Sequence, residues 1–307
     1  MTILAPATTA VVEVTGADRL DYLEAVTSQH LLDAVPGAVR GALQLDPQGA
    51  PLAAFDVVVL AERVLLLVPD AELARQVVEV LGGRTFLSDA RFAARDDVVV
   101  ALRGDDVPAT LRSADLPTAA GAEETGELVV VATRSGGVDL VGPEAGVAEA
   151  AARVLAAGAE EVDAAALEAW EIAHGVPRWG RELAPPHLPE ELGLLATHVH
   201  LAKGCYPGQE AVARMWMLGR PRRRLAEVEA DPGVDAGWTT GAGKRGVVVT
   251  AVDPGTRRGL AFVPADASPG DRVTDDDGTG VTVRGFVGEG LPVPGHDPGV
   301  VRRRDRR

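Results

Sequence analysis

Short apolar runs, each closed by turn-forming residues, constrain this chain more than any other feature of its sequence. Runs such as residues 64–68 and 128–132 are soon followed by Pro, Gly, Ser or charged residues. The 35 glycines and 21 prolines supply many of these breaks, and no apolar run reaches the roughly 20 residues that span a bilayer. The chain is therefore predicted to fold as short strands and short helices joined by tight turns.

Residues 1–95 predict one α+β unit. A strand at residues 11–14 precedes a helix whose apolar residues recur at helical spacing. Residues 56–60 and 64–68 are predicted to pair as a hairpin across a short polar turn. Asp70 then follows at the position where its side chain can cap a second helix.

A similar order of elements predicts a second α+β unit over residues 96–220. An Ala-rich helix is expected at residues 143–157, and Asp163 can cap a further helix. Three strands are expected before these helices, at residues 98–102, 128–132 and 138–141. No repeat between the two halves is visible in the sequence, so their relationship rests on the order of elements alone.

Beyond residue 220 the pattern changes to β-type runs without helical periodicity. These runs lie at residues 225–228, 246–252, 260–263, 272–273 and 281–286. Short strands at this spacing predict a small β-barrel or sandwich over residues 221–307, which ends in a flexible Arg-rich tail. A domain boundary is therefore expected near residue 220, after an α+β region over residues 1–220.

The charge of the chain argues against nucleic-acid binding. The formal net charge is -15 over 307 residues, and it repels phosphate backbones over any distance that salt leaves unscreened. The basic clusters at residues 222–224 and 302–307 are interpreted as a solvated strand start and a frayed tail. Direct tRNA binding is accordingly not expected.

The chain has a single cysteine, Cys205, and its N-terminus lacks the basic and apolar regions of a signal peptide. One thiol cannot form an intramolecular disulfide, nor hold an iron–sulfur cluster or a structural zinc by itself. We therefore expect a cytoplasmic protein, in a reducing compartment, whose cysteine is a free thiol.

Cys205 lies in the octapeptide KGCYPGQE at residues 203–210. The Lys203 ammonium is expected to stabilise the thiolate, and Gly204 and Gly208 let another chain or ligand approach the backbone. The alternative is a buried, inert cysteine. The glycines and Pro207 favour a turn at the surface, so a reactive, exposed thiol is predicted.

This octapeptide resembles the signature of the YgfZ family of folate-binding proteins, relatives of the glycine-cleavage T protein. Residues 210–214 (EAVAR) resemble the continuation of that signature. Residues 175–182 (GVPRWGRE) resemble a stretch shared with the T protein. Near the N-terminus, VTGADRLDYLEAVTSQHL and the LDPQG of residues 45–49 are also similar to that family.

The resemblance implies two ferredoxin-like α+β halves around a central folate pocket, with a C-terminal β-barrel. It implies tetrahydrofolate or a derivative as cofactor, and a monomeric accessory protein that supports the assembly or repair of iron–sulfur enzymes. Its partners would be iron–sulfur client or assembly proteins, with tRNA modification affected through them. Cys205 and Lys203 would be the catalytic residues.

Two departures from the T protein weaken the case for an aminomethyltransferase. The T protein carries adjacent aspartates where this chain has Ala53 and Ala54, so the group expected to activate the folate nitrogen is missing. Its pterin-binding glutamate corresponds to Ala173, with Glu171 two residues earlier. Whether the chain catalyses a reaction is therefore left open.

A folate needs a surface that stacks the pterin, hydrogen bonds for its edge and a basic residue for its glutamate tail. The candidate folate-binding residues are six with suitable side chains and one glycine of the loop: Trp179, Glu182, Tyr206, Gln209, Glu210, Arg214 and Gly208. Core packing is the alternative for Trp179. For Glu182 and Arg214 the alternative is a mutual ion pair or exposure to solvent.

His198 and His200 lie just before the octapeptide, and on a strand they would share a face. Their spacing to Cys205 fits no standard zinc pattern, so no metal site is expected. Three hypotheses remain: a folate-binding accessory factor with a reactive Cys205, a tetrahydrofolate-dependent aminomethyl or other one-carbon transferase, and a non-catalytic scaffold linked to tRNA modification.

Overall fold

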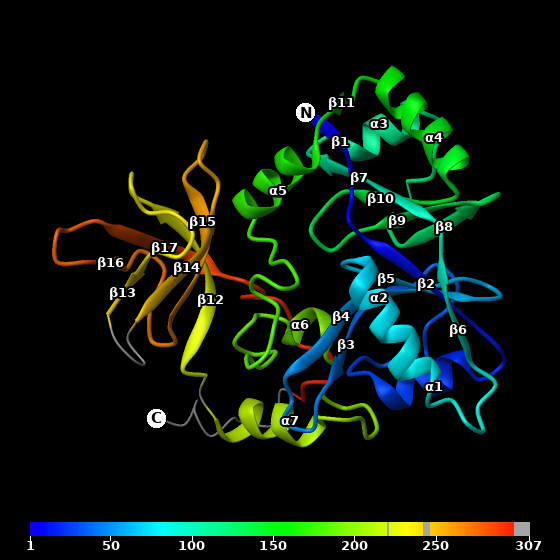
Figure 1. Cartoon of the computed structure of the whole chain (residues 1–307), viewed down its shortest axis with the longest axis horizontal. Helices are drawn as coiled ribbons and strands as arrows, with labels where there is room; N and C mark the ends of the chain where they lie inside the picture. Colours follow the sequence, from blue (N-terminus) through cyan, green and yellow to red (C-terminus); the bar gives the residue numbers. More distant parts are fainter. Residues whose placement is uncertain (119, 220, 242–245, 298–307) are drawn as a thin grey trace. The chain divides into compact units, whose positions relative to one another are not determined.

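The structure, a computed structural model, describes residues 1–118, 120–219, 221–241 and 246–297. It combines helices with three β-sheets, so the mixed architecture of α and β elements predicted from the sequence is confirmed (Figure 1). The Arg-rich tail at residues 302–307 lies outside the described residues. None of the described helices is long and apolar enough to cross a membrane.

Backbone contacts divide the chain into two compact units. Unit 1 comprises residues 1–26, 30–42 and 53–167, and unit 2 comprises residues 27–29, 43–52 and those from 168 onward. Unit 2 is thus assembled from three separate stretches of the chain. The boundaries expected near residues 95 and 220 stay predictions.

The first sheet has five strands. In spatial order they are β3 (Val39–Leu45), β4 (Pro51–Val59), β5 (Val64–Val68), β2 (Ala10–Thr15) and β6 (Arg91–Arg95). Helix α1 (Arg19–Val26) follows β2, and α2 (Ala71–Val77) follows β5 and continues as the π-turn η1 (Val78–Gly82). The predicted hairpin is confirmed in β4 and β5. Asp70 caps α2 as predicted, because its Oδ1 accepts the Leu73 N–H at 2.8 Å.

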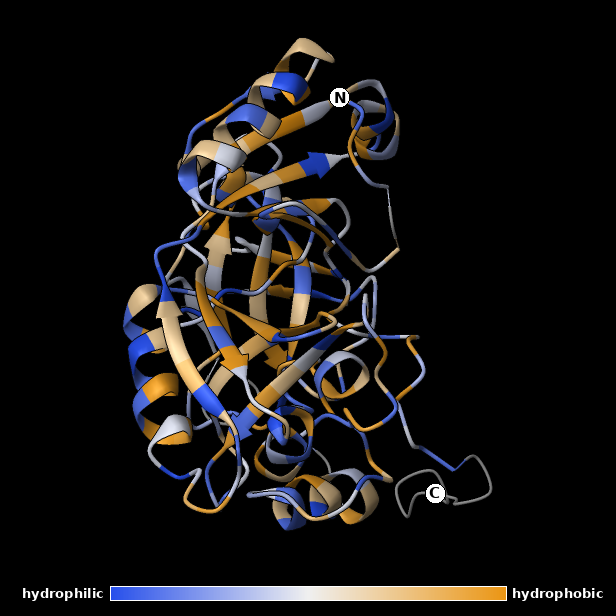
Figure 2. Ribbon diagram, turned by 90° about the vertical axis from the view of Figure 1, so that its right-hand side faces the viewer, coloured by the Kyte–Doolittle hydropathy of each residue, from blue (hydrophilic) through white to orange (hydrophobic). Residues whose placement is uncertain are grey.

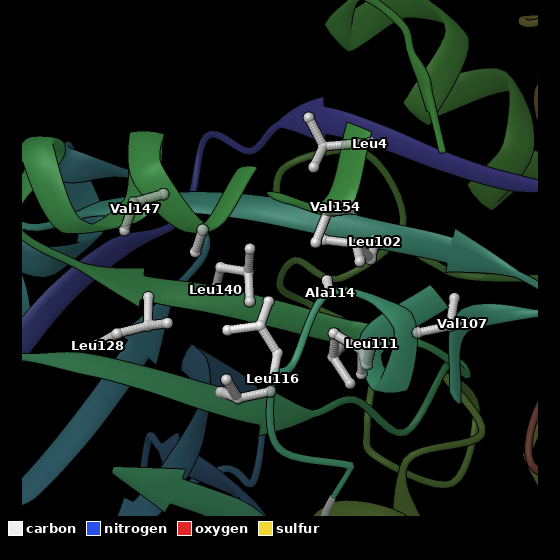
Figure 3. Close-up of a cluster of buried hydrophobic side chains, with 13 residues drawn as sticks. Leu4, Leu102, Val107, Leu111, Ala114, Leu116, Leu128, Leu140, Val147 and Val154 are labelled. Carbon is white, nitrogen blue, oxygen red and sulfur yellow. The ribbon is translucent and has the colours of Figure 1, made fainter. Parts of the chain in front are cut away.

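The second sheet has six strands and carries its helices on one face. In spatial order the strands are β11 (Glu160–Glu161), β1 (Thr2–Pro6), β7 (Val98–Gly104), β10 (Val138–Gly142), β9 (Leu128–Ala132) and β8 (Ala122–Thr125). Helices α3 (Val107–Ser113) and α4 (Glu144–Ala156) turn Leu111, Val147 and Val154 onto Leu102 and Leu140 of the sheet (Figure 3). Val147 and Val154 are seven residues apart, two turns along one helix face.

Strand β9 is apolar throughout, without the alternation of apolar and polar residues that a half-exposed strand has, because both of its faces are covered. Leu128 and Val130 pack into the core under α3 and α4, whereas Val129 and Val131 pack into a second core shared with Val58 and other residues of the five-stranded sheet. Successive side chains of a strand point to opposite faces, so a strand covered on both faces must be apolar throughout. Both cores lie within unit 1.

The C-terminal sheet forms a nearly closed barrel. In spatial order its strands are β13 (Thr239–Thr240), β14 (Val247–Val252), β15 (Arg258–Pro264), β12 (Arg223–Ala230), β17 (Gly280–Phe286) and β16 (Arg272–Thr274). The edge strands β13 and β16 meet where the Thr240 hydroxyl donates to the Thr274 carbonyl at 3.4 Å. Inward residues such as Val228, Val249 and Val263 fill the core. Figure 2 shows hydrophobic residues along much of the strands, whereas the helices carry bands of both hydrophobic and hydrophilic residues.

Three helices lie between the α/β sheets and the barrel in sequence. They are α5 (Ala164–Ala173), α6 (Leu195–His198) and α7 (Gln209–Leu218). Asp163 caps α5 as predicted, since its Oδ1 accepts the Ala166 N–H at 2.8 Å. The strand considered for His198 and His200 is not formed: His198 ends α6 and His200 lies in the segment after it.

Candidate functional site

The candidate site is built on the loop between α6 and α7, which carries the octapeptide. Lys203 and Tyr206 are buried, whereas Gly204, Cys205 and Pro207 are exposed. Cys205 is a free thiol at the surface. The structure therefore excludes the buried, inert cysteine and presents the thiol between two buried anchors.

The first anchor is the Lys203 ammonium. Its Nζ donates to the carbonyl oxygen of Thr27 at 2.6 Å and to that of Gln29 at 2.8 Å. The side chain is only 7% exposed, and a buried ammonium requires such acceptors. Lys203 thus joins the cysteine loop to residues 27–29, which belong to the same unit although they lie far away in the sequence.

Ser28 fixes the backbone that presents these two carbonyl groups. Its fully buried hydroxyl donates to the His198 carbonyl at 2.6 Å and accepts the Leu43 N–H at 2.9 Å. The Ser28 backbone adds two bonds, from its N–H to Leu43 O and from His200 N–H to its own carbonyl, both at 3.0 Å. The acceptors of the Lys203 ammonium are therefore held in place by hydrogen bonds that do not involve the ammonium.

The second anchor is the Tyr206 ring, which is 8% exposed. Burial raises the pKa of the Tyr206 phenol to about 12, because the phenolate would be poorly solvated there. The ring centroid lies 5.2 Å from the Lys203 Nζ, a distance at which an ammonium is attracted to an aromatic face. The two anchors therefore contact each other beneath the exposed thiol loop.

Gly208 begins α7 with a positive φ of 80°. A Cβ there would lie 2.5 Å from the Asp46 carbonyl oxygen, and a Cβ on Gly49 would lie 2.9 Å from that of Ala211. The two glycines thus let the turn of residues 45–49 pack directly on the start of α7. Gln209 adds a hydrogen bond from its Nε2 to the Lys203 carbonyl at 3.4 Å.

A groove of about 670 Å³ lies along α7. Its lining residues are mostly apolar and comprise Pro47, Leu188, Glu210, Ala211, Arg214, Met215, Leu218 and Gly219. Glu210 and Arg214 are exposed and one helical turn apart. Neither side chain forms a hydrogen bond or ion pair with another described residue, so both charges are available to a ligand.

Glu182 occupies a different environment. Its fully buried carboxylate accepts the Arg178 backbone N–H at 2.9 Å and the Arg181 Nε–H at 2.6 Å. The same arginines bind α5, through Arg181 to Glu168 at 2.7 Å and through Arg178 to Glu171 at 2.6 Å. Glu182 is therefore paired with Arg181 and not with Arg214, and its two oxygens already have donors.

The structure brings together the predicted residues of the octapeptide and α7. Lys203, Cys205, Tyr206, Gly208, Gln209, Glu210 and Arg214 follow one another along the loop and the first turns of the helix. Trp179 is half-buried in the turn that contains Glu182, where it forms a β-bridge with Leu183. Their proposed catalytic and folate-binding roles stay predictions.

Sequence reasoning missed the part that residues 27–29 play in this site. The segment was noted only within a longer N-terminal match, and no pattern pointed to Ser28 as the residue that fixes it. Within the described residues, no three His, Cys, Asp or Glu side chains gather as metal ligands. The imidazole of His198 instead contacts the Thr197 hydroxyl at 2.7 Å.

Comparison with known proteins identifies the fold. No protein-family model matches the chain, and no curated protein matches it. Among solved structures, the glycine cleavage system aminomethyltransferase T from Bartonella henselae matches with a TM-score of 0.80 at 19% identity, over 95% of this chain and 87% of that chain. The heterotetrameric sarcosine oxidase from Corynebacterium sp. U-96 matches at a TM-score of 0.36 and 13% identity, over 51% and 83% of the two chains. The chain therefore has the fold of an aminomethyltransferase T.

Proposed function

We propose that this protein binds a reduced folate and uses the exposed Cys205 thiol to support the assembly or repair of iron–sulfur enzymes in the cytoplasm. The observation that carries the proposal is the aminomethyltransferase T fold over 95% of the chain, combined with an octapeptide that displays a free thiol. The fold supports a folate ligand, and the resemblance of KGCYPGQE to the YgfZ signature supports the iron–sulfur role.

The α7 groove fits one end of a folate. A p-aminobenzoyl-glutamate group is apolar along its ring and anionic at its tail, and the groove offers Leu188 and Met215 beside the unpaired Arg214 guanidinium. Its volume lies in the range of roughly 300–1,000 Å³ that is usual for small-molecule sites. Arg214 is therefore assigned to the tail, with Glu210 at the end of the groove nearest the thiol loop.

The pterin end fits less completely. Trp179 is partly exposed and offers a ring face for stacking. The Glu182 carboxylate is already bonded to Arg181 and to the Arg178 backbone, so we assign it to holding this turn and not to the pterin. A bound reduced folate would supply one-carbon chemistry that no side chain offers.

The proposal includes two ferredoxin-like units around a central folate pocket. The succession β2, α1, β4, β5, α2, β6, with β3 as an additional strand between α1 and β4, and the spatial order β4-β5-β2-β6 support the first of these units. The proposed partners are iron–sulfur client or assembly proteins, which would meet the thiol where the loop exposes it.

A folate titration and a cysteine variant test the proposal together. Tetrahydrofolate should raise the melting temperature, since a ligand of the native state at 100 times its Kd adds about 2.7 kcal/mol. Cys205→Ser should keep that shift but fail to restore iron–sulfur enzyme activity in cells that lack the protein. Ala202→Ser, which adds a hydroxyl at an exposed position three residues before Cys205, is the matched control. Full restoration by Cys205→Ser would overturn the role of the thiol.

Aminomethyl transfer is the second candidate, because the matching fold is that of an aminomethyltransferase. Ala53 and Ala54 argue against aminomethyl transfer, because these buried residues of β4 stand at the positions where the resemblance places carboxylates. Incubation with tetrahydrofolate and an aminomethylated lipoyl carrier should therefore form no methylenetetrahydrofolate. Sustained turnover would reverse the ranking, and the absence of any thermal shift with folates would favour a non-catalytic scaffold.

A further inference from the structure

Lysine is rare in this chain, which gives the buried Lys203 particular weight. Of the 30 basic residues only Lys203 and Lys244 are lysines, and the other 28 are arginines. A compact ammonium can direct its donors at closely spaced carbonyl oxygens, whereas the planar guanidinium of arginine needs more room and a different geometry. Position 203 therefore has a requirement for lysine that the rest of the basic surface does not share.

The contacts of Lys203 show what that requirement is. The ammonium binds the carbonyl oxygens of Thr27 and Gln29 at 2.6 and 2.8 Å, on either side of the immobilised Ser28. Three residues later Tyr206 is buried as well, so the chain is fixed before and after Cys205. The exposed stretch between the two fixed points contains only Gly204 and Cys205.

We infer that Lys203 is a positioning residue, whose ammonium clamps the cysteine loop to the carbonyl groups of Thr27 and Gln29 and so presents the Cys205 thiol at the surface. This replaces the role predicted from the sequence, in which the lysine acts as the charge that activates the thiol. Ser28 belongs to the same clamp because it orients the two acceptors. The functional role of the clamp rests on the proposed function of Cys205. The contacts that form the clamp do not depend on that proposal.

Three variants separate the clamp from the charge. Lys203→Met removes both the positive charge and the two hydrogen bonds. Lys203→Arg keeps the charge but places a larger, planar group in the buried site. Ser28→Ala leaves the lysine intact and removes the hydroxyl that bonds His198 and Leu43.

Hydrogen–deuterium exchange of residues 200–212 is the first measurement, made on the full chain, and its reporters are the amides of His200, Gln209 and Val212, which donate to the carbonyl groups of Ser28, Tyr206 and Gly208. All three variants should exchange at least about tenfold faster there than the natural protein, because each loses hydrogen bonds that close the loop. Val154→Ala, which shortens a fully buried side chain in unit 1, controls for general loss of stability and should leave this segment unchanged. Unchanged exchange in Ser28→Ala and Lys203→Arg would overturn the inference, even if Lys203→Met fails to fold.

The pH profile of Cys205 alkylation by iodoacetamide is the second measurement. Its midpoint reports on the charge near the thiol and should not move when the loop only becomes looser. Under the clamp the midpoint should be the same in all variants to within about 0.3 pH units. A midpoint that rises by a full unit in Lys203→Met, but stays fixed in Lys203→Arg and Ser28→Ala, would show instead that the lysine activates the thiol. Neither measurement uses folate or a client enzyme, so failure of the clamp and failure of the proposed function are distinguishable.

Discussion

The packing of the turn at residues 45–49 against α7 leads to a quantitative prediction for Gly208→Ala. An alanine at a φ of 80° costs about 1–2 kcal/mol in backbone strain. Its Cβ would also lie 2.5 Å from the Asp46 carbonyl oxygen and 2.8 Å from the Leu45 Cβ, and backbone must move to relieve that overlap at a cost of about 1–3 kcal/mol. We expect a total loss of about 2–5 kcal/mol in the free energy of unfolding of unit 2.

The chain offers a matched control in Gly180→Ala. Gly180 has a φ of 79°, but a Cβ there would meet no atom within 4 Å, so only the backbone strain is shared with Gly208. All four tryptophans lie in unit 2, at positions 170, 179, 216 and 238, so their fluorescence reports on that unit during unfolding in urea. If Gly208→Ala is no less stable than Gly180→Ala, then close packing of the turn on α7 is refuted.

Two further predictions concern buried ionisable groups. The raised pKa of Tyr206 means that its contribution to stability is complete below pH 10 and is lost as the pH rises through about 12. Urea unfolding between pH 9 and 12 should show that loss, and Tyr206→Phe should reduce it. Tyr22, whose pKa burial also raises, contributes to the part that remains. An undiminished loss in Tyr206→Phe would contradict the assignment. Arg181→Met should cost about 3–5 kcal/mol, because it strands the buried Glu182 carboxylate. Arg284→Met, which removes an exposed ion pair of unit 2, should cost less than about 1 kcal/mol, and equal losses would show that the Glu182 pair is not important.

Elements with strong local patterns could be predicted from the sequence. The apolar run of β5 and the capping position of Asp70 are properties of a few adjacent residues, and both predictions are confirmed. Strand β1 was missed because its pairing partner, β7, lies about a hundred residues away. Helix α7 was missed because the residue that precedes it, Gly208, has a left-handed conformation and offers no capping side chain.

The sequence could predict which side chains belong to the candidate site, but not which backbone groups they bind. The exposure of Cys205 followed from Gly204, Pro207 and Gly208, which favour a surface turn. The partners of Lys203 could not be inferred, because they are backbone carbonyl groups, and every residue has one. The Glu182–Arg214 pair, which was considered as an alternative, is not formed, because the Glu182 carboxylate is bonded to the adjacent Arg181.

The composite make-up of unit 2 has a consequence for how the chain folds during synthesis. The two ends of the Lys203–Thr27 bond are 176 residues apart, and at about 5–20 residues per second a ribosome needs roughly 9–35 s to make that stretch. Throughout this interval Thr27 has been synthesised but lacks Lys203, and Ser28, synthesised directly after it, lacks His198 and His200 for nearly as long. The nascent chain therefore carries an unfinished surface, exposed to chaperones, until the cysteine loop emerges and completes it.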